Sequence, residues 1–328
     1  LKTIEQEKLN NRVADLDVAT SENDIEQSIA QVYIQILYAA ESVKVNENTL
    51  QVSEAQRDRG KQLLDAGSIA RSDYAQLEAQ VSTDRYQLVT AQATLQDYKL
   101  QLKQLLELDG EQEMQVYLPA LGDENVLSPL PTKTDVFRSA VALRPEIEAS
   151  KLSVEASELG IGIAKSGYLP SVSLTAGIGT NHTSGSDFTF GEQVKNGWNN
   201  SIGLSISVPI FNNRQTKSAV EKAKLQYQTS QLTLLDEQKT LYKTIEGLWL
   251  DANSAQQRYA AAIEKLHSTQ TSYELVSEQF NAGMKNTVEL LTEKNNLLQA
   301  QQELLQSKYM AILNTQLLKF YQGDKITL

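Results

Sequence analysis

The sequence predicts a mainly α-helical chain with one β-hairpin, in which two long antiparallel helical hairpins flank an irregular middle segment. All six prolines lie between Pro119 and Pro209, so the flanks, 1–106 and 213–321, contain none. Helix interiors exclude proline because it removes a backbone donor and clashes with the preceding turn. The flanks are also rich in Ala, Gln, Leu, Glu and Lys, the composition of long helices.

The composition argues against several classes of protein. The chain has 328 residues, a formal charge of −11 and no cysteine. The acidic balance disfavours nucleic acid, whose phosphates require clustered Lys and Arg. Without cysteine there are no disulfides, thiolate metal sites or Cys nucleophiles. His182 and His267 have no acidic cluster at ligand spacing, and no phosphate-binding or nucleophile motif occurs. We therefore expect no enzyme activity, no catalytic residue, no metal site and no cofactor.

Each flank contains one strong turn signal centred on a glycine. A glycine after a long helix takes the left-handed conformation at low cost and ends the helix. Each flank therefore predicts a hairpin, whose descending arm of about 65 residues spans on the order of 95–100 Å at 1.5 Å per residue. The residues of the two turns are Asp65, Ala66, Gly67 and Ser68 in the first flank, and Asn281, Ala282 and Gly283 in the second.

The two flanks are related by an internal repeat. Laying Gly67 on Gly283 gives an offset of 216 residues that holds without a gap from Leu1 to Leu105, and it places Tyr33 on Trp249. The second hairpin is preceded by a linker, a helix and a β segment, whereas the first begins at Leu1. We therefore expect a complete two-repeat protein to carry about a hundred further residues upstream, and this chain to be a fragment or processed form.

The middle segment divides into a linker, a helix and a β-hairpin. Residues 107–143 form an equatorial linker region, in which Thr134-Asp135 predict the start of a short helix that ends at Leu143. A second helix is predicted over 144–167. Pro145 is compatible with its first position, where the backbone N–H would have no partner in the helix. The hairpin occupies 168–212, and 322–328 form a C-terminal tail.

Two segments of the hairpin, 171–179 and 201–210, alternate strictly between apolar and small polar residues. Each is about ten residues long, the length of a tilted strand that crosses a bilayer. Aromatic residues at both ends resemble the girdles of membrane interfaces. The apolar face comprises Val172, Leu174, Ala176, Ile178, Ile202, Leu204, Ile206, Val208 and Ile210.

This hairpin needs partner strands from elsewhere. A hairpin of an ordinary sandwich alternates in the same way, but the sequence offers no other strong strand pair to form an opposing sheet. A lone hairpin is marginal in water, and open sheet edges are not viable in lipid. We therefore expect other copies of the chain, the upstream repeat or both to complete a closed intersubunit β-barrel. The long helices likewise carry narrow apolar stripes and need neighbours along their length.

The motifs together resemble those of the TolC-like outer-membrane efflux protein family. Segment 167–174 (Gly-Tyr-Leu-Pro-Ser-Val-Ser-Leu) is similar to the family motif that leads into a strand, and 207–212 (Ser-Val-Pro-Ile-Phe-Asn) to the motif that follows one. Segment 144–147 (Arg-Pro-Glu-Ile) resembles the family's helix start. The Ala-Gly pairs at 66–67 and 282–283 resemble its periplasmic tip turns. The motifs occur in family order across nearly the whole chain.

The resemblance implies a passive, homotrimeric exit channel in the outer membrane of a Gram-negative bacterium, with helical α-barrel staves forming a large periplasmic part. Its implied partners are further copies of itself, outer-membrane lipid, a periplasmic adaptor (membrane fusion protein) and, through the adaptor, an inner-membrane pump of a tripartite efflux or type I secretion system. The cargo would be small molecules or polypeptides. The tip turns would dock the adaptor, and Tyr168, Pro170, Pro209 and Phe211 would mark where the chain enters and leaves the barrel.

The resemblance also suggests a gate at the periplasmic aperture. Family members carry acidic residues just beyond the tip turn, and Asp73 and Glu289 lie six residues past Gly67 and Gly283. Lys285 would pair with Asp73 across the two hairpins in a closed state. The alternative is that both carboxylates are solvated helix-start residues favoured by the helix dipole.

Two other classes of protein share some of these features. A periplasmic adaptor also has a long helical hairpin, but it carries one hairpin flanked by lipoyl-like β segments. A structural coiled-coil stalk lacks an amphipathic β-hairpin between helical repeats. Bilayer conductance of the full-length protein separates the three.

Overall fold

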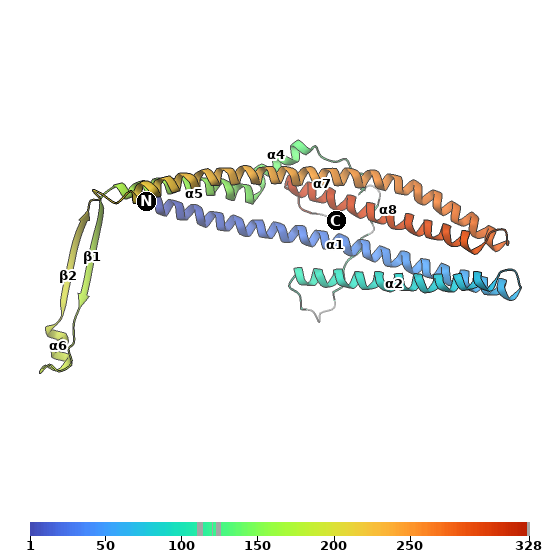
Figure 1. Ribbon diagram of the computed structural model, residues 1–328, viewed down its shortest axis with the longest axis horizontal. Helices are drawn as coiled ribbons and strands as arrows, with labels where there is room; N and C mark the ends of the chain where they lie inside the picture. The colour runs from blue at the N-terminus through green and yellow to red at the C-terminus, as the bar shows by residue number, and fades with distance from the viewer. Residues whose placement is uncertain (110–113, 120, 123–125, 327–328) are drawn as a thin grey trace. The chain divides into compact units, whose positions relative to one another are not determined.

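The computed structural model describes residues 1–328 except 110–113, 120, 123–125 and 327–328, so the predicted linker and tail are described only in part (Figure 1). Among the described residues, no helix combines the length and apolarity that crossing a membrane requires. The mainly helical fold is confirmed. The elements are α1 (Lys2–Asp65), α2 (Arg71–Leu105), α4 (Lys133–Leu143), α5 (Pro145–Lys165), β1 (Ser171–Gly179), α6 (Phe190–Asn196), β2 (Asn199–Ser207), α7 (Gln215–Asn281) and α8 (Thr287–Gln322).

The chain divides into two compact units that cut across the predicted domain limits. The first unit contains Leu1–Leu16 and Glu148–Asp236, and the second contains Asp17–Ile147 and Glu237–Leu328. The limits differ because α1 and α7 each contribute residues to both units.

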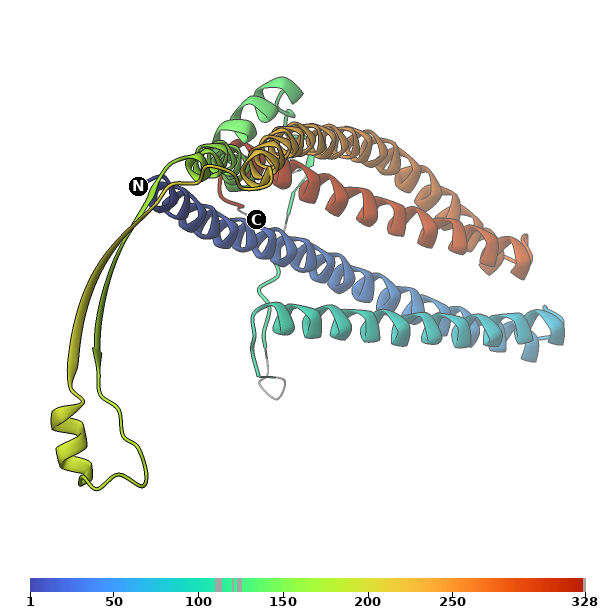
Figure 2. The same cartoon turned by 60° about the vertical axis from the view of Figure 1, so that its left-hand side comes forward.

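The second unit contains two antiparallel helical hairpins, α1–α2 and α7–α8 (Figures 1 and 2). Ion pairs join the arms of each hairpin: Arg85 pairs with Glu54 at 3.0 Å, and Lys265 pairs with Glu303 at 2.7 Å. These pairs are partly exposed, so they contribute little to stability. The main apolar cluster lies deeper, where α1, α7 and α8 bury aliphatic and tyrosine side chains around Ile34, Leu37, Tyr259, Tyr309 and Ile312.

Repeat-related aromatic residues hold the described part of the linker on the helices. Tyr33 donates its hydroxyl to the carbonyl oxygen of Tyr117 at 2.7 Å, and Trp249 donates its indole N–H to that of Pro131 at 3.0 Å. Tyr33 and Trp249 are the pair that the offset of 216 superposes. Both repeats therefore use an aromatic donor at the same position to satisfy a linker carbonyl.

Helices α4 and α5 meet at Arg144-Pro145, as predicted. The predicted start of α4 was wrong by one to two residues, because Thr132 rather than Thr134 caps the helix. The Thr132 side chain accepts from the backbone N–H of Asp135. Thr132 has the extended backbone that a capping residue needs, whereas Thr134 lies inside the first turn.

In the first unit, β1 and β2 form a two-stranded antiparallel sheet in which Val172 pairs with Ile206 and Leu174 with Leu204. The predicted apolar faces of the two strands therefore coincide. The predicted end of the second strand at Ile210 was wrong, because β2 ends at Ser207 and Pro209 has no N–H for a ladder.

The segment between the strands contains helix α6, which the loop prediction missed. The side chain of Thr189 accepts from the N–H of Glu192, and the carboxylate of Glu192 accepts from the N–H of Thr189 at 2.9 Å. This reciprocal capping box stabilises a helix that is too short to show periodicity in the sequence. The Thr-x-x-Glu spacing was the available signal.

Candidate functional site

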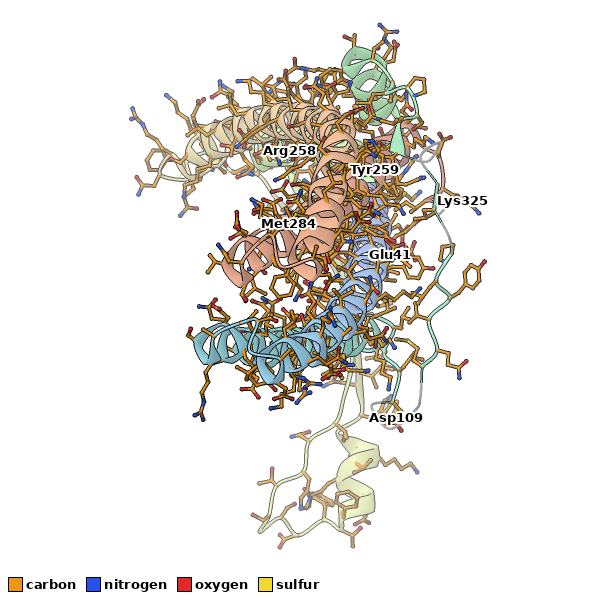
Figure 3. All side chains as sticks on the ribbon, turned by 90° about the vertical axis from the view of Figure 1, so that its right-hand side faces the viewer. Glu41, Asp109, Arg258, Tyr259, Met284 and Lys325 are labelled. Atoms are coloured by element: carbon orange, nitrogen blue, oxygen red, sulfur yellow. The ribbon has the colours of Figure 1, made fainter. Side chains whose placement is uncertain are left out.

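The two tip turns, both in the second unit, share one backbone geometry. Gly67 and Gly283 have φ of 73° and 75°, which favours glycine. Ser68 donates its N–H to the carbonyl of Leu63 at 2.8 Å, and Met284 donates to that of Gln279 at the same distance. These are the bonds of a Schellman motif. Met284 marks the second turn in Figure 3.

The carboxylates beyond the turns cap the returning helices. Asp73 accepts from the N–H of Ala70 at 3.3 Å, and Glu289 accepts from that of Asn286 at 3.1 Å. Asn286 completes a capping box by accepting from the N–H of Glu289 at 2.9 Å, whereas Ala70 has no side-chain acceptor with which to do so. In this structure both carboxylates therefore make the contacts of helix-start residues.

Lys285 pairs with Glu289 inside its own hairpin rather than with Asp73 across the two hairpins. The ammonium, together with the backbone N–H of Asn286, lowers the pKa of Glu289 below its ordinary value. The cross-hairpin pair does not form here because Lys285, which directly precedes the N-cap Asn286, pairs with the carboxylate of Glu289 in the first turn of α8.

A cavity of about 650 Å³ lies between the tips and brings the predicted residues of both hairpins together. The three predicted aperture residues all line it, as do Gly67, Ser68 and Gly283 from the turns. The remaining turn residues, Asp65, Ala66, Asn281 and Ala282, do not line it. Apolar and charged side chains both line the cavity, and its other lining residues are Leu63, Ile69, Ala70, Phe280, Met284, Asn286 and Thr287.

An apolar cluster adjoins the cavity and shares Leu63 and Phe280 with its lining. Phe280, Leu77 and Leu290 are buried and come from α7, α2 and α8, with Leu63 and Tyr273 packed around them. Both hairpins therefore contribute to one core close to the tips.

Sequence reasoning missed a buried charged cluster further from the tips. Lys294 contacts the carboxylate of Asp84 and the hydroxyl of Ser53, and the hydroxyl also donates to the same carboxylate. The signal was present: Lys294 lies in the apolar stripe of α8, and Asp84 follows Leu77 and Val81 at helical spacing.

Arg144 is a second buried charge that the sequence did not reveal. Its guanidinium lies 4.2 Å from the ring centroid of Phe320 and 4.1 Å from that of Tyr321. Burial lowers the pKa of Arg144, while the nearby carboxylates of Glu146 and Asp24 oppose this shift. The contact fastens the α4–α5 junction to the end of α8.

The β-hairpin exposes its whole apolar face. Leu174 is 74% exposed and Ile202 is 84% exposed. The predicted barrel residues lie at the strand ends: Pro170 directly precedes β1, and Pro209 follows β2 by two residues. Their aromatic neighbours Tyr168 and Phe211 are exposed.

Across the part of the chain that the structure describes, no group of three or more His, Asp or Glu side chains is placed to hold a metal ion.

Comparison with known proteins gives a family and related structures. The sequence model of the family described as "Outer membrane efflux protein" matches residues 136–323. The chain is 25% identical to Outer membrane protein TolC of Escherichia coli (strain K12) over 315 residues, 92% of this chain and 62% of that protein. It is 23% identical to Alkaline protease secretion protein AprF of Pseudomonas aeruginosa, over 90% of this chain and 60% of that protein.

The fold is also that of a solved channel structure. The Campylobacter jejuni CmeC outer membrane channel has a TM-score of 0.80 with this chain at 20% identity, covering 100% of this chain and 68% of that one. This chain thus spans about 60% of the length of the two curated relatives. It belongs to the outer membrane efflux protein family and is a protein of the Gram-negative outer membrane.

Proposed function

We propose that the protein is a passive, homotrimeric exit channel that carries small molecules or polypeptides from the periplasm to the exterior. The observation that carries this proposal is the β-hairpin, which is apolar on one face and lined by small polar residues on the other. Its apolar side chains are exposed, including Val172, Leu174, Ile202 and Ile206. Burying such side chains away from water contributes about 1.5–3 kcal/mol each, so a surrounding of lipid tails suits this face.

The unpaired edges of the same hairpin favour a closed intersubunit barrel. The sheet of the described residues has two strands, each paired along one edge only. Lipid offers no hydrogen-bond partner for the other edges, so further strands must pair with them. Sister chains and the rest of each chain supply those strands in this proposal.

The helical tips are the proposed docking site for a periplasmic adaptor. The cavity between the turns is lined by both hairpins and combines the apolar side chains of Leu63 and Phe280 with three charged ones, Asp73, Lys285 and Glu289. An adaptor that inserts an aliphatic side chain and pairs a basic group with Asp73 matches this lining. Through the adaptor, an inner-membrane pump would supply the energy that the channel lacks.

The test is single-channel conductance of the purified full-length protein in a planar bilayer, with the mass of the detergent-solubilised particle measured in parallel. We expect trimeric particles and discrete, ohmic conductance steps. A matched variant that carries Leu174→Lys on the apolar face should insert less efficiently than the parent, whereas Ser173→Lys on the opposite face should insert as the parent does. A water-soluble monomer without conductance would refute the proposal.

A further inference from the structure

A buried ion pair joins the two hairpins of the second unit. The side chain of Lys294 is 4% exposed and that of Asp84 is 1% exposed, and the two form an ion pair. The buried hydroxyl of Ser53 contacts both groups. Gln80 donates to the second oxygen of the same carboxylate at 2.8 Å. The charges are therefore compensated, and both carboxylate oxygens accept hydrogen bonds.

The members of this cluster come from three helices. Ser53 and Asp84 belong to α1 and α2 of the first hairpin, and Lys294 belongs to α8 of the second. Lys294 lies about 10 Å along α8 from its start, and Asp84 lies about 20 Å along α2, at 1.5 Å per residue. The pair therefore fixes one axial stagger between the hairpins.

Buried charge makes this stagger specific. A slip by one helical turn, about 5.4 Å, would separate the buried ammonium from the buried carboxylate and leave each without its counter-charge, which is far more costly than an imperfect apolar contact. Burial lowers the pKa of Lys294, and the Asp84 carboxylate opposes that shift. By contrast, the apolar contacts around Phe280 are non-directional and can re-form after a slip.

The three positions that the internal repeat relates to this cluster do not carry the same residues. The offset of 216 places Thr269 on Ser53, Ala300 on Asp84 and Glu78 on Lys294. This set contains one charge and no counter-charge, so the equivalent contact between the second hairpin and a following first hairpin would have no ion pair.

We propose that Lys294, Asp84 and Ser53 form a register lock that holds the two hairpins of one chain at a single axial stagger.

The lock is tested by a distance measured within one chain. The chain has no cysteine, so Ser68→Cys and Met284→Cys place one spin label on each tip of the full-length protein. Labelled chains are diluted into unlabelled ones, and double electron–electron resonance then reports the distance between the tips of a single chain. The readout requires neither conductance nor a trimer, so failure of the lock and failure of the channel proposal are separate results.

We expect one narrow distance in the parent protein. Lys294→Met and Asp84→Leu should each broaden it and add a population displaced by about one turn, ~5.4 Å. The charge swap Asp84→Lys with Lys294→Asp should return a single peak. Lys265→Met, which removes a lysine–glutamate pair inside the second hairpin, should leave the distance unchanged.

The doubly apolar variant, Asp84→Leu with Lys294→Met, separates register from stability. It removes both charges, so it should unfold thermally close to the parent while its distance distribution stays broad. A narrow, parental distance in this variant would overturn the lock, because packing alone would then set the stagger. Equal broadening by Lys265→Met, or a broad distance in the parent, would overturn it as well. If a single variant fails to fold, the charge-swap and doubly apolar variants still test whether the ion pair sets the stagger.

Discussion

Replacing Gly67 by alanine should open the first tip turn about fivefold more often. The backbone φ is 73°, and a Cβ added there would meet no heavy atom within 4 Å, so no steric clash contributes. The whole cost is that of the left-handed conformation for a residue with a Cβ, about 1 kcal/mol. A free-energy difference of about 1.4 kcal/mol changes an equilibrium constant tenfold, so a cost of about 1 kcal/mol raises the population of the open turn about fivefold.

The assay is cleavage of the tip by a dilute, nonspecific protease. When opening and closing are fast relative to cleavage, the rate follows the population of the open turn. The control is Gly247→Ala in the middle of α7, where the added Cβ also meets nothing. There alanine should stabilise the helix by about 0.5–1 kcal/mol. Unchanged tip cleavage in Gly67→Ala, or destabilisation by Gly247→Ala, would refute the reasoning.

Three further predictions concern the charges and the β-hairpin. Lys285 lowers the pKa of Glu289, so the ionised carboxylate should stabilise the second tip fully above the ordinary glutamate pKa and lose this effect as the pH falls through the lowered pKa. Cleavage at the tip should therefore rise at acidic pH, and Glu289→Gln should abolish that pH dependence. Arg144→Lys keeps the charge but loses the planar contact with two aromatic rings, so it should cost about 1 kcal/mol, visible as a lower thermal midpoint. Leu174→Lys should destabilise the membrane-inserted state by about 2–4 kcal/mol if the residue lies at mid-bilayer, and Ser173→Lys by much less, as measured by unfolding from lipid vesicles.

The long helices were predictable because their ends depend on local chemistry. Helix interiors exclude proline, and Gly67 and Gly283 end their helices because glycine adopts the left-handed conformation at low cost. The strand faces were predictable for the same reason, since alternation is a local pattern. The errors were also local: a seven-residue helix shows no periodicity, and Pro209 ended β2 earlier than its apolar pattern suggested.

The contacts between the hairpins were not predictable from local patterns. Lys294 and Asp84 are separated by 210 residues, and their pairing depends on how two hairpins pack. A lysine inside an apolar stripe marks a buried charge, but it does not identify the partner. For the same reason the sequence suggested Asp73 for Lys285, whereas the structure pairs Lys285 with Glu289 of its own hairpin.

In the proposed channel, one face of the β-hairpin contacts lipid and the other contacts water. Single spin labels placed from 172 to 178 along β1 of the full-length protein in vesicles test it, because oxygen partitions into lipid and a polar nickel complex stays in water. We predict that oxygen accessibility peaks at Val172, Leu174, Ala176 and Ile178 and that nickel accessibility peaks at Ser173, Thr175 and Gly177, with a period of two. Equal accessibility to the nickel complex at all of these positions would contradict the account.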